Sequence, residues 1–453
     1  MHFNVMIIGG GPGGYTAAFE AAKAGLSVCL IEEREVGGTC LNRGCIPTKT
    51  FVHTADLYRE LNDPDMTAID VESFRFNTEK LLEKKNRIVT ELRAGIEKAL
   101  KSSKITVMSG KASLTDAHTA HVNGETVTAD HTILATGSVP SGIPVEGADL
   151  PCVITSDDVL ETLPLCKEIV IVGGGVIGCE MAGIYEAAGT KVTILEALDR
   201  LLPNMESELG RSLALTFKKR GIEVHAKTFL RKIEQKESRL RVSYEEKGAL
   251  NEKECDLVLL AAGRQAVTDV FEGEAPVMER GRFVIDESCM TSIPDLYAIG
   301  DCAGSYPQLA HTAMAMAVNA VCAITGKKPE RDMNVIPSSV YTSPEIAACG
   351  LSEKEAHEKG YEVFSAKANT MANARSLIAS SERGFMKLTV EKGSGKLLGA
   401  FMMCERATDL IHEAALAVHQ EMTVPQVLNM IHGHPTFSEV FVSALEAAEK
   451  KLG

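Results

Sequence analysis

Short apolar runs and glycine-rich turns alternate along the 453-residue chain. The apolar run at residues 5–8 enters a glycine-rich turn, an alanine-rich segment then extends to Lys23, and a second apolar run at 28–31 ends at Glu32. A buried run of this length, followed by turn residues and a helical segment, is typical of a parallel strand and its crossover helix. The pattern predicts a β-α-β unit at the start of the chain.

The same unit returns later in the sequence with a constant offset of 164 residues. The equivalent pairs are Gly9 and Gly173, Gly11 and Gly175, Gly14 and Gly178, Gly25 and Gly189, and Glu32 and Glu196. In a Gly-x-Gly-x-x-Gly turn, the first glycine makes the turn, the second admits a pyrophosphate and the third packs helix on strand. An acid at the end of the second strand binds a ribose, and the offset selects Glu32 rather than Glu33. Two such units predict two bound dinucleotides and an internal redox relay.

The remaining elements complete a fold with two Rossmann-like (βαβ) α/β units and a C-terminal α+β domain. Residues 78–101 are predicted to form a long amphipathic helix with Leu92 on its apolar side and its charges in solvent. Residues 105–127 alternate as short antiparallel strands do. Strands ending in glycine turns are predicted at 132–138, 257–264 and 296–301, and no glycine fingerprint follows residue 335.

Charge and composition exclude several functional classes. A net charge of −14 argues against nucleic acid as a main partner, because no basic excess offsets phosphate repulsion. Ten of the twelve cysteines are scattered along the chain, which favours a reducing cytoplasm. The first apolar run has no preceding cationic region, so it is predicted to be a strand rather than a signal peptide. No apolar run approaches the ~20 residues that span a membrane. His432 and His434 lack a cysteine or carboxylate at zinc spacing, so no metal is expected.

Cys40 and Cys45 lie between glycines and just before Pro47. An unbroken helix would hold two Cα atoms five positions apart too far from each other for a disulfide, but Gly44 allows a distortion. Three hypotheses remain from these residues: half of a zinc site, for which no second pair is visible, a chance pair of buried thiols, or a redox-active dithiol.

Residues 37–49, Gly-Gly-Thr-Cys-Leu-Asn-Arg-Gly-Cys-Ile-Pro-Thr-Lys, resemble the redox-disulfide segment of the flavin-dependent disulfide reductases, and most closely that of their dihydrolipoamide dehydrogenase branch. The resemblance covers essentially the whole chain and implies FAD at the first fingerprint, NAD at the second, and oxidation of dihydrolipoamide to lipoamide by NAD⁺ through a Cys40–Cys45 disulfide. The chain departs from the family at 265–268, which replaces Pro-Asn, and at 312–317, which replaces acidic residues and a glycine.

The resemblance also assigns roles to residues. Catalytic roles fall to the dithiol Cys40 and Cys45, to Lys49 paired with Glu180, and to an acid–base dyad of His434 and Glu439. Besides the two fingerprints and their acids, the implied cofactor-binding residues are Gly38, Thr39, Lys49, Ala112, Thr136, Gly137, Ser138, Gly263, Asp301 and Ala310.

The implied domains are an FAD-binding domain at 1–147 with a return part at 266–334, an NAD-binding domain at 148–265 and a dimerisation domain at 335–453. In this family the dyad of one subunit completes the active site of the other, which implies a homodimer. The lipoyl group would come from another protein, the E2 of a 2-oxo acid dehydrogenase complex or the glycine cleavage H protein.

Alternatives within the family are glutathione, trypanothione and mercuric reductases. Glu196 disfavours the first two because it would repel the 2′-phosphate of NADPH, and the chain lacks the C-terminal cysteine pair of the third. A non-catalytic flavoprotein subunit is a further alternative, which loss of Cys40, Cys45 or His434 would have favoured.

Overall fold

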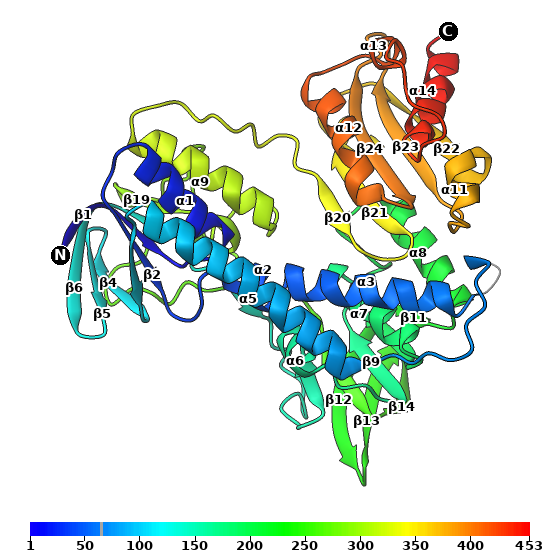
Figure 1. Ribbon diagram of the computed structural model, residues 1–453, viewed down its shortest axis with the longest axis horizontal. Helices are drawn as coiled ribbons and strands as arrows, with labels where there is room; N and C mark the ends of the chain where they lie inside the picture. Colours follow the sequence, from blue (N-terminus) through cyan, green and yellow to red (C-terminus); the bar gives the residue numbers. More distant parts are fainter. Residues whose placement is uncertain (64–66) are drawn as a thin grey trace.

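The computed structural model describes residues 1–63 and 67–453. Figure 1 shows the N-terminal unit at one side, the second unit below the centre and the C-terminal domain above it. Two long helices, α3 (Cys45–Leu61) and α5 (Thr78–Ser102), extend from the first unit to the second. The chain therefore has three packed regions, and one inserted segment joins the first two.

The first sheet has the strand order β3-β2-β1-β6-β5-β4, with β19 beside β6. Its strands are β1 (His2–Ile8), β2 (Val28–Glu32), β3 (Thr106–Ser109), β4 (Ala112–Asp116), β5 (Thr119–Val122), β6 (Glu125–Leu134) and β19 (Leu296–Ala298). The helices α1 (Pro12–Lys23) and α9 (Ala310–Ile324) pack together over it. Central strands such as β1 are buried because helices cover a parallel sheet, which explains their unbroken apolar runs.

The expectation of antiparallel strands throughout 105–127 is wrong for its first part. β3 pairs in parallel with β2, as Leu30 opposite Val107 shows, and only β4, β5 and β6 are antiparallel. Alternation indicates exposure of one strand face and carries no information on strand direction.

The second sheet has the order β11-β10-β9-β15-β8 and is parallel throughout. Its strands and helices are β8 (Val153–Thr155), β9 (Glu168–Val172), β10 (Lys191–Glu196), β11 (Glu223–Ala226), β15 (Leu257–Leu260), α6 (Ser156–Thr162), α7 (Val176–Ala187) and α8 (Ser207–Lys219). An antiparallel sheet of β12 (Thr228–Lys236), β13 (Arg239–Glu246) and β14 (Ala249–Cys255) projects from it.

Two short strands, β7 (Ser138–Pro140) and β16 (Arg264–Ala266), pair where the chain leaves and re-enters the first unit. Small elements follow: β17 (Met278–Glu279), β18 (Arg282–Phe283) and the 3₁₀ turn η1 (Gly300–Cys302).

The C-terminal domain is an antiparallel sheet in the order β20-β21-β24-β23-β22, with helices against it. Its elements are β20 (Ser338–Val340), β21 (Glu345–Gly350), α10 (Glu353–Glu358), β22 (Val363–Asn369), η2 (Thr370–Ala372), α11 (Ala374–Ile378), β23 (Phe385–Glu391), β24 (Leu397–Cys404), α12 (Ala407–His419), α13 (Val424–Leu428) and α14 (Glu439–Leu452).

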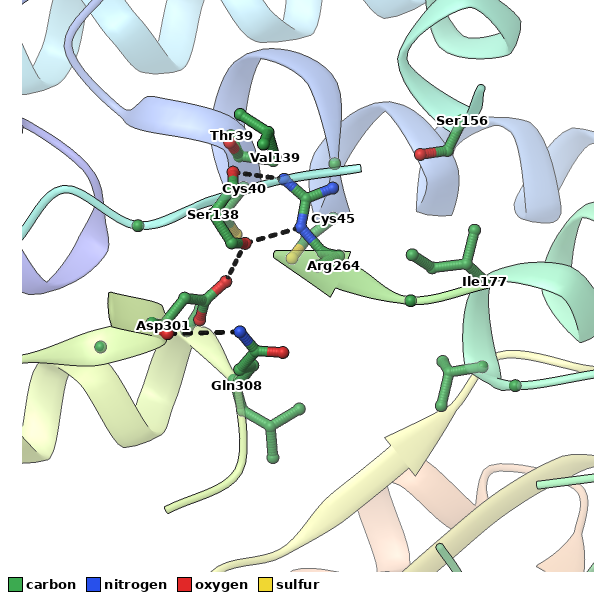
Figure 2. Close-up of a pocket in the computed structure, with 18 of the residues that line it drawn as sticks. Thr39, Cys40, Cys45, Ser138, Val139, Ser156, Ile177, Arg264, Asp301 and Gln308 are labelled. Atoms are coloured by element: carbon green, nitrogen blue, oxygen red, sulfur yellow. Dashed lines mark hydrogen bonds between the residues drawn. The ribbon is translucent and has the colours of Figure 1, made fainter. Parts of the chain in front are cut away.

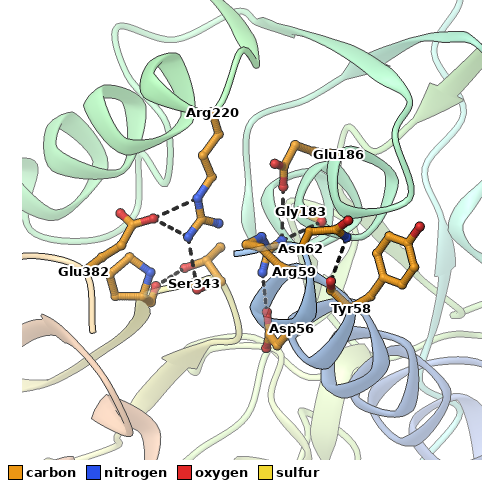
Figure 3. A network of polar contacts seen from close by, with 11 residues as sticks. Asp56, Tyr58, Arg59, Asn62, Gly183, Glu186, Arg220, Ser343 and Glu382 are labelled. Atoms are coloured by element: carbon orange, nitrogen blue, oxygen red, sulfur yellow. Dashed lines mark hydrogen bonds and ion pairs between the residues drawn. The ribbon is translucent and has the colours of Figure 1, made fainter. Parts of the chain in front are cut away.

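Polar contacts join the three regions (Figure 3). Arg59 of α3 binds Glu186 and the carbonyl of Gly183 on α7 at 3.1 and 3.0 Å. Arg220, after α8, binds Glu382 of the C-terminal domain at 2.9 Å through Nε. The second unit is thereby tied to both of its neighbours.

Helix α5 forms at the predicted position, but two of its side chains lie elsewhere than expected. Leu92 is 45% exposed, whereas Lys85 is buried and faces the charge of Glu161. Burial lowers the pKa of Lys85, because the ammonium loses hydration there. A long helix that crosses two domains buries different faces along its length.

Among residues 1–63 and 67–453, no helix is both long and apolar enough to cross a membrane. The same residues contain no group of three or more His, Cys, Asp or Glu side chains placed to hold a metal ion.

Candidate active site

A cavity of 1860 Å³ runs from the first glycine turn, past Cys40 and Cys45, to the second glycine turn. The predicted site residues that line it are Gly9, Gly11, Glu32, Gly38, Thr39, Cys40, Cys45, Lys49, Ala112, Thr136, Gly137, Ser138, Gly173, Gly175, Glu180, Glu196, Gly263, Asp301 and Ala310. The fold thus brings together residues from both fingerprints and from the inserted segment.

The glycines of the two fingerprints have the same geometry. Gly9 and Gly173 have φ of +106° and +112°, a region that side chains rarely adopt. A Cβ on Gly14 would lie 1.8 Å from the carbonyl oxygen of Gly9, and one on Gly178 would lie 1.9 Å from that of Gly173. Gly14 and Gly178 therefore act behind the cavity wall, where they let the helix pack on the turn.

Close backbone approach extends to Gly38, where a Cβ would lie 2.6 Å from the Cα of Gly11. The start of α2 (Gly38–Arg43) thus packs against the first glycine turn. Because these glycines carry no side chains, the space beside the N-terminus of α1 stays open to a phosphate-bearing ligand. The first unit therefore fits the pyrophosphate of FAD.

The predicted ribose acids are fixed alike in the two units. One oxygen of Glu32 accepts a backbone N–H from the glycine turn at 2.6 Å, and the other accepts an N–H two residues beyond it at 2.8 Å. Both corresponding distances at Glu196 are 2.6 Å, and Glu196 is buried. The N–H donors lie at equivalent positions: Gly10 and Arg34 in the first unit, Gly174 and Leu198 in the second.

Arg200 lies near Glu196 in the sequence, in the loop between β10 and α8, which begins only at Ser207. Its guanidinium binds Asp199 at 2.7 Å and the carbonyl of Pro203 at 2.9 Å. It is thereby turned to its own loop, and it is not one of the described residues that line the cavity.

The helix carrying the two cysteines breaks where the sequence predicted a distortion. Gly44, with φ −145° and ψ −112°, ends α2 and precedes α3, so Cys40 and Cys45 belong to different helices. Both are free thiols and share a hydrogen bond. A single residue thus brings together two sulfurs that a continuous helix would separate.

The pKa values of the two thiols are shifted in opposite directions. The hydrogen bond from Cys40, together with the positive charge of Lys49, lowers the pKa of Cys45 to about 7, against the effect of burial. The pKa of Cys40 is raised, first because it keeps the shared proton and second because it is buried. In the reduced pair, Cys45 is therefore the thiolate and Cys40 the thiol.

Lys49 and Glu180 form the pair that the family resemblance implies. The ammonium of Lys49 lies 2.9 and 3.0 Å from the two carboxylate oxygens of Glu180, whose side chain is 3% exposed. Burial is the largest single effect and would lower the pKa of Lys49, but the charge and hydrogen bond of Glu180, together with the charges of Cys45 and Tyr341, outweigh it and the pKa is raised. Lys49 therefore stays charged one helical turn from Cys45.

Asp301 belongs to a network that the sequence did not reveal in full (Figure 2). The hydroxyl of Ser138 donates to Asp301 at 2.5 Å, and Arg264 donates to that hydroxyl at 2.8 Å and to the Ser138 carbonyl at 2.7 Å. Gln308 donates to the carbonyl of Asp301 at 3.3 Å. Arg264 and Gln308 were not predicted. The available signal was that Arg264 follows Gly263 and that Gln308 lies two residues before Ala310. Only the β7–β16 pairing brings Arg264 to Ser138.

The two departures from the family pattern lie at this site. Residues 265 and 266 belong to β16, and the carbonyl of Val267, just after the strand, accepts the hydroxyl of Thr136 at 2.6 Å. Residues 312–317 lie in α9, where the buried hydroxyl of Thr312 has no hydrogen-bond partner among the described residues.

His434 and Glu439 form a dyad outside the cavity. Nδ1 of His434 lies 2.9 Å from one Glu439 oxygen, and the N–H of Thr436 donates to the other at 2.8 Å. The Thr436 N–H, followed by His434, lowers the pKa of Glu439. None of the described residues that line the cavity belongs to 432–439, so one chain alone does not bring this dyad to its own dithiol.

Comparisons with known proteins match the whole chain. Residues 3–317 match the family model described as pyridine nucleotide-disulphide oxidoreductase, and residues 336–445 match the dimerisation domain of that family. A dihydrolipoyl dehydrogenase of Chlamydia trachomatis is 36% identical over 99% of this chain and 98% of its own length. A dihydrolipoyl dehydrogenase of Geobacillus stearothermophilus is 35% identical over 99% and 96%. Among solved structures, the HOCl-induced flavoprotein disulfide reductase RclA from Escherichia coli aligns with a TM-score of 0.87 at 28% identity, over 98% of this chain and 99% of that one.

Proposed function

The chain belongs to the pyridine nucleotide-disulphide oxidoreductases, enzymes that use FAD and NAD(H), and we propose that it oxidises dihydrolipoamide to lipoamide with NAD⁺ as acceptor. The observation that carries the proposal is the dithiol at the helix break, with the pKa of Cys45 lowered to about 7 and Lys49 beside it. This pair borders a cavity that reaches both glycine fingerprints. A thiol substrate and two nucleotides thus have adjoining sites.

The thiol chemistry balances with the residues present. Starting from a Cys40–Cys45 disulfide, the first substrate thiol loses its proton to the general base, which passes it on to solvent. The resulting substrate thiolate attacks Cys40, forming a mixed disulfide and releasing Cys45 as a thiolate. The second substrate thiol gives its proton to the general base and attacks the substrate sulfur of the mixed disulfide. Lipoamide leaves, and Cys40 takes up the proton. Two electrons have then passed to the protein, which holds the Cys40 thiol and Cys45 thiolate described above.

FAD, when bound, supplies the electron transfer between the reduced dithiol and NAD⁺. The residues that would hold it are the first glycine turn, Glu32 at the ribose, and Asp301, fixed by Ser138, at the ribityl chain. Lys49, anchored by Glu180, would supply a positive charge to the flavin. The second glycine turn and Glu196 would hold NAD⁺.

The general base in this proposal is His434 of a second copy of the chain. Within one chain the dyad lies outside the cavity, and residues 336–445 match a dimerisation domain, so a homodimer supplies the missing group. Glu439 would orient the imidazole through Nδ1 and leave Nε2 to exchange protons with the substrate thiol.

The physiological substrate would be a lipoyl group on a separate carrier protein of a 2-oxo acid dehydrogenase or glycine cleavage complex, in the cytoplasm. The relatives named dihydrolipoyl dehydrogenase support this substrate. A different disulfide substrate is the second candidate, favoured by the likeness to the reductase RclA.

The purified flavin-loaded protein should oxidise NADH in the presence of lipoamide, and dihydrolipoamide should reduce NAD⁺. Cys40→Ser and Cys45→Ser should each abolish both reactions, while Cys349→Ser, which alters a buried thiol in β21 of the C-terminal domain, should not. Turnover of glutathione disulfide with none of lipoamide would favour the second candidate. Full lipoamide turnover by either active-site variant would contradict the proposed dithiol.

A further inference from the structure

The ion pair beside the dithiol is contacted by a residue of the C-terminal domain. Tyr341 follows β20 directly, and its backbone N–H donates to Glu180 Oε1 at 3.0 Å. Its ring lies below the ammonium of Lys49, with 4.6 Å from Nζ to the ring centroid. One residue thus contacts both members of the pair, the anion through its backbone and the cation through its side chain.

These contacts affect how strongly the Lys49 ammonium interacts with Glu180 and how strongly with the Cys45 thiolate. Glu180 holds Lys49 through both carboxylate oxygens, and one of these also accepts the Tyr341 N–H, which offsets part of the carboxylate charge. The negative face of an aromatic ring attracts a cation and restricts where the ammonium settles. Because Lys49 stabilises the Cys45 thiolate while Glu180 opposes it, small shifts of the ammonium change the acidity of Cys45.

The ring itself is held from within the C-terminal domain. The phenol of Tyr341 hydrogen-bonds to Thr408 at the start of α12, and the hydroxyl and N–H of Thr408 both donate to Glu345 of β21, at 2.7 and 2.9 Å. Burial raises the pKa of the Tyr341 phenol, so the ring stays neutral. Contacts within the C-terminal domain therefore help to fix the position of the ring.

We propose that Tyr341 is a positioning residue that sets the reactivity of Cys45 by placing the Lys49 ammonium between Glu180 and the thiolate. Through it the dimerisation domain contributes to the dithiol of its own chain, in addition to any group it supplies to a second copy. The inference rests on the proposed redox role of Cys45.

The charged and titratable groups that face Cys45 come from four elements: Cys40 of α2, Lys49 of α3, Glu180 of α7 and Tyr15 of α1. Tyr341 touches two of them and does not touch the sulfur in any described contact. A change at Tyr341 therefore reaches Cys45 only through Lys49 and Glu180.

The test measures the reactivity of Cys45 directly. Reduced holoprotein is treated with iodoacetamide between pH 5 and 9, and trypsin cleavage after Arg43 places Cys40 and Cys45 on different peptides for mass spectrometry. The variants are Tyr341→Leu, which keeps the N–H but removes the ring, Tyr341→Phe, which keeps the ring, and Tyr361→Leu as a matched control on an exposed tyrosine. Tyr341→Met replaces the leucine variant if that variant does not fold.

Tyr341→Leu should raise the pH midpoint of Cys45 alkylation by about half a unit, which lowers the rate about threefold at a pH below both midpoints. Tyr341→Phe should shift it less, and Tyr361→Leu should not shift it. If the midpoint is unchanged in Tyr341→Leu but raised in Lys49→Met, the role of Tyr341 is overturned and that of Lys49 is kept. An unchanged midpoint in Lys49→Met overturns both this inference and the proposed role of Lys49.

Discussion

The two β-α-β units are copies up to their ribose acids and differ after them. From the first glycine to the acid, turn, helix, strand and carboxylate contacts repeat at an offset of 164 residues. Beyond the acid, the second unit returns to its sheet through α8 alone before β11, whereas the first passes through α2, α3 and α5 before β3. The repeat therefore fixes the nucleotide-binding scaffold, and the insertion in one copy carries the thiols.

The insertion is also what connects the copies. Lys49 and Arg59 of α3 both bind α7 of the second unit, through Glu180 and Glu186. The residue equivalent to Glu180 in the first unit is Thr16, which has no charge. A duplicated scaffold thus became asymmetric: one copy supplies the dithiol and the other supplies the anion that anchors its lysine.

The largest expected effect lies outside both copies, at the dyad of the C-terminal domain. His434→Gln should slow dihydrolipoamide oxidation by about 10²–10⁴, the usual contribution of one general base. Reduction of the protein by NADH does not require that base and should change much less. Stopped-flow measurement of the two half-reactions checks this, and equal losses in both would indicate a structural histidine instead.

Substitution of the third glycine in each fingerprint should show which nucleotide each β-α-β unit binds. Gly14→Ala and Gly178→Ala each force a Cβ onto a backbone carbonyl oxygen, and such overpacking costs up to about 3 kcal/mol, or about 100-fold. The first variant should lose FAD, and the second should keep FAD but bind NADH about 100-fold more weakly. Gly183→Ala is the matched control in α7, because a Cβ there meets nothing within 4 Å. Flavin absorbance measures FAD retention and an NADH titration measures NADH binding. If only Gly178→Ala lost FAD, the assignment of FAD to the first unit and NAD to the second would be reversed.

The ribose acids should distinguish the nucleotides by charge. A 2′-phosphate beside Glu196 would meet a like charge, and a lost charge-assisted hydrogen bond is about 1.5–3 kcal/mol, so NAD⁺ should be preferred over NADP⁺ by at least about tenfold. Glu196→Ala should reduce that preference in kcat/KM, whereas Glu32→Ala should weaken FAD binding and leave the cofactor ratio unchanged. An unaltered ratio in Glu196→Ala would show that another residue selects the cofactor.

The smallest effects are expected where the second copy meets its neighbours. Arg220→Met removes one partly exposed ion pair, with Glu382, and Arg59→Met removes two, with Asp56 and Glu186 (Figure 3). Each variant should therefore lower the free energy of unfolding by only about 1 kcal/mol per ion pair. The two arginines share no partner, so the double variant should show the sum of the two changes. Chemical denaturation checks this, and a much larger combined loss would mean that the two contacts stabilise one cooperative interface.

Local patterns in the sequence were sufficient for the two β-α-β units and for the fingerprint, acid and dithiol residues of the cavity wall. Glycines at fixed spacing determine the turns because side chains rarely adopt their backbone angles and would meet nearby backbone, and the constant offset of the repeat is by itself enough to identify Glu32 and Glu196 as equivalent. The break at Gly44 followed from the same freedom. These are short-range constraints, and they act within a few residues of the side chains that encode them.

Tertiary structure decided whatever depends on which surfaces meet. The direction of β3, the exposure of Leu92 and the burial of Lys85 differ from the predictions because periodicity gives one face of an element but not its neighbour. Arg264 reaches Ser138 only because β16 pairs with β7. The ring of Tyr341 lies at Lys49 only because a third domain packs there, at a distance of 292 residues along the chain. Long-range contacts of this kind depend on the packing of whole domains, which no local pattern specifies.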